Sequence, residues 1–157
     1  ALVLLDQAVH QPGIGWNMVK SMAQYHDLWV LVSAYHRPGI EAELAKNPMP
    51  NVEFVFLDVP FWSLKKNTKF FAIHYHLWQF TSYRKAQQLH KAIQFDLGHH
   101  VTYGKYWSPS LLAMLDLPFI WGAVGGGEAA PTSFYETLTP QGRRKERLRT
   151  FVQYQPL

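Results

Sequence analysis

The chain has 157 residues, of which 48% are hydrophobic, 15% aromatic and 17% charged. A chain of this length predicts one domain, and its apolar content is sufficient for a core and argues against disorder. No apolar run approaches the roughly 20 residues of a membrane-spanning helix, and the first residues lack the pattern of a signal peptide. The absence of cysteine excludes disulfides and thiolate metal sites. We therefore expect a cytoplasmic location.

The formal net charge of +4 comes from one segment. Residues 143-RRKERLR-149 contain five basic side chains and one glutamate, whereas the rest of the chain has ten basic and ten acidic residues. Nucleic-acid-binding proteins usually spread Lys and Arg over a docking surface, so this distribution argues against nucleic acid as a partner. The segment predicts a solvated helix, and it leaves open a peripheral contact with an anionic membrane surface or with another domain.

Apolar runs and helical patterns alternate along the chain. The predicted strands, in chain order, are residues 1–5, 28–33, 52–57, 97–101 and 118–122. The predicted helices between and after them are residues 16–25, 40–46, 70–93, 108–115 and 142–154. This alternation predicts an α/β fold, a Rossmann-like three-layer sandwich with a mostly parallel sheet and right-handed crossovers. We expect residues 1–157 to form this single domain.

In such a sheet, ligands bind beyond the carboxyl ends of the strands. The segment 11-QPGIGWN-17 follows the first strand there. Gly13 and Gly15 permit a tight turn, and the amides and dipole of the next helix would favour an anion. Trp16 follows in place of the rest of a dinucleotide fingerprint, so an ordinary strand–helix turn and a phosphate or sugar site both remain open.

Two adjacent histidines, His99 and His100, end the predicted fourth strand. Adjacent residues of a strand face opposite sides of the sheet, so we expect one imidazole, but not both, to open to the cleft. We favour His100. A histidine at a strand's carboxyl end can act as a general base, because its ordinary pKa lies near neutrality. A structural role, with the ring buried and hydrogen-bonded, remains the alternative for each.

A run of three glycines follows the fifth strand in 120-IWGAVGGGEAAP-131. The backbone amides of Gly125, Gly126 and Gly127 could form a nest for an anion or a sugar hydroxyl. Glu128 could accept hydrogen bonds from sugar hydroxyls or cap the next helix. A loose linker is a poor explanation, because the tract directly follows an apolar run that we expect to be buried.

Four other polar residues are weak candidates for a metal site or a catalytic nucleophile. His74 and His76 stand at i, i+2 on a predicted helix and do not share a face, which argues against a metal pair. Ser110 and Ser133 lack the setting of a catalytic nucleophile.

Four motifs, in the right order, resemble the N-terminal half of glycosyltransferase family 4, a group of GT-B enzymes. They are Gly13-x-Gly15-Trp16, 26-HDLWVL-31, 96-DLGHH-100 and 122-GAVGGGE-128. Each motif alone is weak, and their order and spacing together are more specific. The resemblance covers roughly residues 2 to 150.

The resemblance implies an acceptor-side domain of a retaining hexosyltransferase, which transfers a sugar from a nucleotide-sugar to a glycan, lipid or small-molecule acceptor. It implies no metal and no resident cofactor. The donor would bind mainly to a C-terminal domain that this chain does not contain, so we expect the chain to be inactive alone. The candidate substrate-binding residues are Gly13, Gly15, Trp16, Tyr103, Gly125, Gly126, Gly127 and Glu128, and the candidate catalytic residues are His100 and His99.

Two departures from the family pattern bear on these assignments. Many members have Asp-x-x-His-x-His at the fourth strand, whereas here Asp96 and His99 match and Val101 takes the second histidine's place. Relatives also often have proline where Ala123 stands.

Because only one domain would be present, we expect aromatic side chains at the cleft edge to be exposed and to favour self-association of the chain. These are Trp16, Tyr103, Tyr106 and Trp107.

Two rival interpretations remain. A stand-alone Rossmann-like nucleotide- or ligand-binding module would need a third glycine in the first loop and an acidic residue after the second strand, where 33-SAYH-36 stands. An interaction domain without a ligand would leave the glycines and histidines at the strand ends unexplained.

Overall fold

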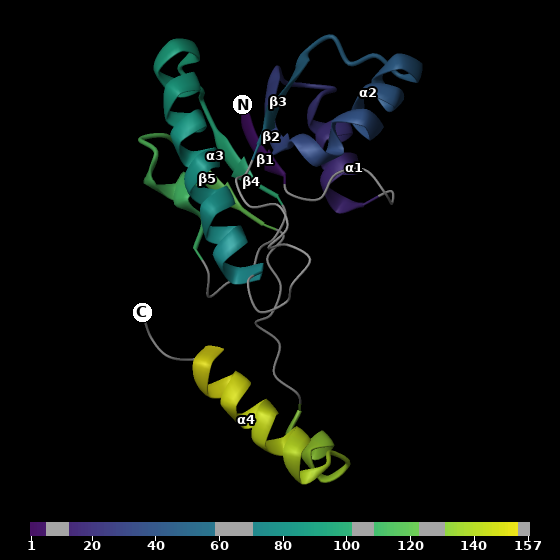
Figure 1. Ribbon diagram of the computed structural model, residues 1–157, viewed down its shortest axis with the longest axis vertical. Helices are drawn as coiled ribbons and strands as arrows, with labels where there is room; N and C mark the ends of the chain where they lie inside the picture. The colour runs from purple at the N-terminus through teal and green to yellow at the C-terminus, as the bar shows by residue number, and fades with distance from the viewer. Residues whose placement is uncertain (6–12, 59–70, 102–108, 123–130, 154–157) are drawn as a thin grey trace.

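A five-stranded parallel sheet forms the centre of the molecule in a computed structural model that describes residues 1–5, 13–58, 71–101, 109–122 and 131–153 (Figure 1). The strands are β1 (Leu2–Leu5), β2 (Leu28–Ser33), β3 (Val52–Leu57), β4 (Gly98–His100) and β5 (Phe119–Trp121). Their order in the sheet is β3-β2-β1-β4-β5, and every neighbouring pair is parallel. The predicted α/β class and Rossmann-like sandwich are confirmed, and all five apolar runs are strands.

Helices cover both faces of the sheet. One face is covered by α1 (Ile14–Met22) and α2 (Arg37–Lys46), and the other by α3 (Phe71–Ile93) (Figure 1). Short 3₁₀ helices occupy Ala34–His36, Leu111–Met114 and Thr132–Glu136. The last helix, α4 (Pro140–Gln153), lies apart from the sheet and its covering helices (Figure 1).

The core consists of two layers that follow the alternation of side chains along β1 and β2. Leu2 and Leu4 pack with Trp78 of α3, whereas Val3 and Leu5 pack with Val19 of α1 on the opposite face. All four residues of β1 are inaccessible to solvent. The central strand is apolar throughout because it is covered on both faces, as expected for a parallel sheet.

The bounds of several helices differ from those expected from sequence. The α2 helix begins at Arg37, three residues before the predicted start at residue 40, because the proline at position 38 is tolerated in the first helical turn. The predicted helix over residues 108–115 is only the 3₁₀ helix Leu111–Met114, which Ser110 caps by accepting a hydrogen bond from the amide of Leu112 at 3.2 Å. The α1 helix spans Ile14–Met22 where we predicted residues 16–25, since Gly13 serves as its N-cap.

The α3 helix ends in a specific cap. Gln94 adopts a φ of 56°, a left-handed conformation that is unfavourable for a residue with a side chain. Its amide nitrogen Nε2 donates to the carbonyls of His90 and Lys91 at 3.1 and 3.2 Å. The backbone amide of Phe95 also donates to His90 Nδ1 at 3.0 Å. The two bonds from Gln94 satisfy carbonyls that a helix end leaves open, and the bond from Phe95 fixes the chain as it leaves the helix towards β4.

Within the described residues, none of the helices is long and apolar enough to cross a membrane.

Candidate functional site

The order in which strands are added to the sheet reverses at β1, between β1 and β4. The chain passes from β1 to β2 and β3 on one side, then crosses back to β4 and β5 on the other side of β1. In open α/β sheets, ligands bind at the carboxyl ends of the two strands that flank such a switch point. The strands concerned end at Leu5 and His100, and the register pairs Leu4 with His100.

The chain that leaves β1 re-enters the described structure at the N-terminus of α1. Gly13 is the N-cap residue, in an extended conformation, and provides no side-chain cap to the first turn. The first-turn amides of a helix have no acceptor within the helix, and the dipole makes this end favourable for an anion. Gly15 lies buried in the first turn. This end of α1 can therefore accept an anionic or hydroxyl-bearing ligand through its backbone.

Trp16, in contrast, is part of the core. The side chain is only 8% exposed, and its ring stacks on Phe54 of β3 with the centroids 5.9 Å apart. Our expectation that Trp16 is an exposed aromatic of the cleft was wrong. Trp16 and Val19 stand three residues apart and present one face of α1 to the sheet. Of the residues proposed from the first loop, Gly13 and Gly15 stay as candidates at the start of α1, whereas Trp16 packs into the core.

His99 and His100 lie on opposite faces of the sheet, as the alternation of a strand predicts. His100 is a register partner of Leu4, in the layer beneath α3, and His99 is a register partner of Val3, in the layer beneath α1. The expectation that one imidazole opens to a cleft is not met, since His99 is 7% exposed and His100 is 0% exposed.

The two histidines have different surroundings. The Nε2 atom of His99 lies 3.1 Å from the carbonyl oxygen of Gly122, to which a protonated Nε2 donates. This bond ties β4 to the residue that follows β5. The His100 ring instead lies near the indole of Trp78, with centroids 6.2 Å apart. The His99 ring is therefore held by a hydrogen bond to the backbone, whereas the His100 ring packs beside an aromatic side chain.

Two buried indole nitrogens are close to His100 in the fold. Trp121, the last residue of β5, is the register partner of His100, and Trp78 contacts its ring from α3. Within the described part of the chain, the Nε1 atoms of Trp78 and Trp121 are buried and have no hydrogen-bond partner. A buried donor without an acceptor costs about 1–3 kcal/mol, so a ligand oxygen that accepts from either would recover that energy. Neither residue was predicted from the sequence, because no sequence pattern marks a single tryptophan as a hydrogen-bond donor to a ligand.

A buried polar side chain of α3 holds the segment after β4 in place. The Nε2 atom of Gln79 donates to the Tyr75 hydroxyl at 2.9 Å and to the Pro109 carbonyl at 3.2 Å. Its Oε1 atom accepts from the amide of Leu111 at 3.2 Å. Gln79 thus fixes where the chain returns to the sheet after the fourth strand. No local pattern in the sequence marks this residue, because the contact joins residues about thirty positions apart.

The remaining candidates divide into two groups. His74 is buried and His76 is exposed, so these side chains do not share a face of α3. No group of three or more metal-ligating side chains occurs among the described residues. Outside the described residues lie Tyr103, Gly125, Gly126, Gly127 and Glu128, together with Tyr106 and Trp107, and their predicted roles stay predictions.

Two surface hollows are found elsewhere. One, of about 650 Å³, is lined by residues such as Trp29, Glu53 and Lys85, and the other, of about 480 Å³, by residues such as Lys20 and Glu43. Both include residues that precede β2 and β3, at the amino ends of the strands. Neither includes a residue of the switch point.

Comparisons of this chain with protein-family models, with curated proteins and with solved structures found no match. Function must therefore be argued from the residues at the switch point.

Proposed function

We propose that residues 1–157 form the acceptor-side domain of a retaining GT-B glycosyltransferase that resembles family 4. The enzyme would transfer a hexose from a nucleotide-sugar to a glycan, lipid or small-molecule acceptor. The observation that carries the proposal is topological: α1 begins at glycines after β1, and β4 ends at His100, so both follow from the two strands that flank the switch point.

The chemistry available at this edge fits sugar transfer. A helix N-terminus without a side-chain cap can stabilise negative charge, such as the charge that develops on a departing diphosphate. An imidazole can accept a proton from an acceptor hydroxyl. The indole N–H groups of Trp78 and Trp121, which have no partner within the described residues, can donate to sugar oxygens. In this proposal, His100 is the catalytic candidate, and His99 positions Gly122, which precedes the glycine run by three residues in sequence.

The end of β2 disfavours a dinucleotide as the ligand of this chain alone. Dinucleotide-binding domains place a carboxylate there to bind the ribose hydroxyls. Here β2 ends at Ser33, which is buried, and the next residues are Ala34, Tyr35 and His36. The acidic group that this mode of binding needs is absent from those positions.

Calorimetric titration of the purified chain with several nucleotide-sugars, combined with a sugar-transfer assay, tests the proposal. The expected result is cooperative thermal unfolding, negligible donor affinity and no turnover, because the donor would contact mainly a second domain. Micromolar binding of a nucleotide-sugar, or multiple-turnover transfer by this chain alone, would mean that it is the donor half or belongs to another class.

A further inference from the structure

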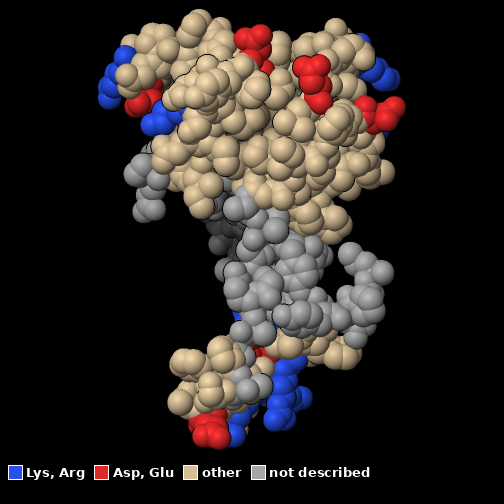
Figure 2. All heavy atoms as spheres, turned by 180° about the vertical axis from the view of Figure 1, so that it is seen from behind, with Lys and Arg blue, Asp and Glu red and all other residues tan. Residues whose placement is uncertain are grey.

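The α4 helix concentrates the net positive charge of the protein. Its first turn is capped by Thr139, whose hydroxyl accepts from the amide of Gly142 at 3.1 Å, and Pro140 occupies the first helical position. The single acidic side chain of the basic segment, Glu146, pairs with Arg149. The remaining basic side chains of the segment are all exposed, namely Arg143, Arg144, Lys145 and Arg147. Figure 2 shows Lys and Arg gathered on this part of the molecule.

Large apolar side chains are exposed on the same unit. Leu148 and Phe151 of α4 are 62% and 64% exposed, and Phe134 of the preceding 3₁₀ helix is 60% exposed. Leu148 and Phe151 stand three residues apart and therefore lie on one side of the helix. Exposed apolar groups of this size on one short helix indicate a surface that is covered by a partner.

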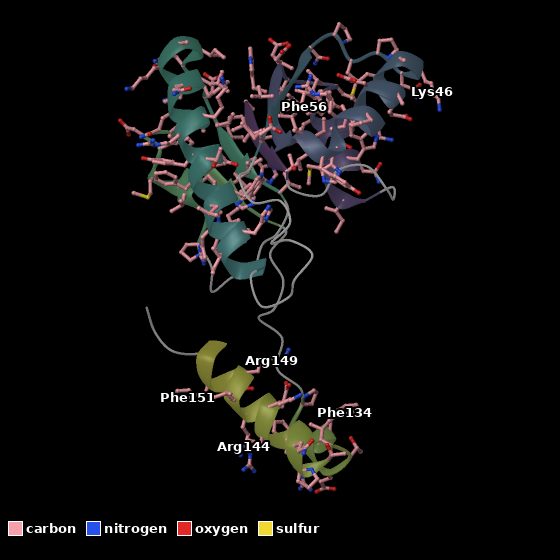
Figure 3. All side chains as sticks on the ribbon, in the orientation of Figure 1. Lys46, Phe56, Phe134, Arg144, Arg149 and Phe151 are labelled. Carbon is pink, nitrogen blue, oxygen red and sulfur yellow. The ribbon has the colours of Figure 1, made fainter. Side chains whose placement is uncertain are left out.

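The apolar and basic side chains are adjacent to one another. Arg144 precedes Leu148 by four residues, and Arg147 precedes Phe151 by four, so each apolar side chain has a basic neighbour one turn away. Figure 3 shows Arg144 and Phe151 projecting from the same side of α4 and Arg149 from the other side. Long basic side chains beside aromatic and aliphatic groups can reach phosphates while the apolar groups enter the acyl boundary.

We propose that α4 is a docking helix for the surface of an anionic lipid bilayer. Charge complementarity selects this occupant, since an anionic bilayer offers both a layer of phosphates and an apolar layer beneath it. A nucleic acid offers the phosphates but no environment that favours the burial of Leu148. The inference does not depend on the proposed glycosyltransferase activity, because it uses no residue of the switch point.

Vesicle co-sedimentation of the chain provides the first test. We expect binding to vesicles of phosphatidylcholine with about 30% phosphatidylglycerol, little binding to phosphatidylcholine alone, and release in about 1 M salt, where the screening length falls to about 3 Å. The double substitution R143Q/R144Q should lower the partition coefficient about 25-fold, at about fivefold per basic residue. The matched control is K46Q/K91Q, which removes two exposed basic residues outside α4 and should leave binding unchanged.

Insertion is tested at single sites, because the chain has no cysteine. An environment-sensitive nitrobenzoxadiazole dye at F151C should shift to the blue on anionic vesicles, while the same dye at K46C should not. This readout keeps the proposal testable even if the doubly substituted chain folds poorly. An unshifted dye at F151C, equal losses of binding in K46Q/K91Q and R143Q/R144Q, or binding to duplex DNA that outcompetes anionic vesicles would each overturn the proposal.

Discussion

The imidazole of His100 lies against the indole of Trp78, with ring centroids 6.2 Å apart and ring planes tilted by 53°. His100 is the last residue of β4 and Trp78 belongs to α3, so this contact joins the helical layer to the sheet at its carboxyl edge. A side chain confined by packing has few orientations available. That is the condition under which a proton-transferring group is effective, provided its ring reaches the substrate.

The first prediction concerns the two histidines. In the protein that carries this chain, His100→Ala should lower kcat by about 10²–10⁴-fold, because a positioned base is lost. His99→Ala should lower kcat much less and should destabilise the fold by about 1 kcal/mol, because the hydrogen bond to Gly122 is lost. Steady-state kinetics and thermal unfolding separate these effects. Normal turnover in both variants would remove the histidines from the mechanism.

The second prediction concerns the buried indole N–H of Trp121. Trp121→Phe keeps an aromatic ring but removes an N–H that has no partner within the described residues. If that N–H donates to the acceptor, KM for the acceptor should rise about 3- to 10-fold, the value of one neutral hydrogen bond, with no loss of thermal stability. Trp29→Phe is the control, since Trp29 packs against Phe95 away from the switch point. An unchanged KM in Trp121→Phe would contradict a role in acceptor binding.

The third prediction compares two glycines. If the glycine tract forms the predicted nest for a ligand, Gly126→Val should reduce activity more than stability, because the new side chain would compete with that ligand. Gly98→Ala should do the reverse, because its new Cβ would lie 3.2 Å from Leu117 Cδ1 inside the fold. Activity per folded molecule and the melting temperature are the two measurements. A Gly126→Val enzyme with normal kinetics and a lower melting temperature would identify a purely structural turn.

The fourth prediction concerns the end of α3. Gln94→Gly should be more stable than Gln94→Ala by about 1 kcal/mol, because glycine adopts the left-handed conformation without a steric penalty. Both variants lose the exposed hydrogen bonds from the Gln94 side chain to the carbonyls of His90 and Lys91. The difference in their free energies of unfolding therefore measures the cost of the left-handed backbone conformation alone. Urea unfolding of the two variants measures it. Equal stabilities would show that no strain is stored at this position.

The five strands could be predicted because each lies in a short apolar run, and short apolar runs bounded by polar or turn residues favour strands over helices. The β1 and β2 strands are buried on both faces, which produces continuous apolar segments that a period-two pattern alone would miss. The boundaries were less predictable. Pro38 resembles a breaker in sequence, yet the helix incorporates it in its first turn.

The site was predictable only in part. Alternation along β4 correctly places His99 and His100 on opposite faces, but it contains no information about what covers each face. The ring of Trp78 comes from a helix that begins far upstream, and the bond from Gln79 to Leu111 spans 32 residues. Trp16 was predicted at the cleft because it follows two glycines of the loop after β1. Its spacing of three residues from Val19 instead indicates a position on the core face of α1.

The most direct test of the central claim is the stereochemistry of transfer by the protein that carries this chain. The protein is incubated with a panel of nucleotide-sugars and acceptors, the nucleoside diphosphate is followed by phosphorus NMR, and the new linkage by proton NMR. The account predicts acceptor-dependent release of the diphosphate and a product with the anomeric configuration of the donor. A product of inverted configuration, or donor turnover catalysed by residues 1–157 alone, would contradict it.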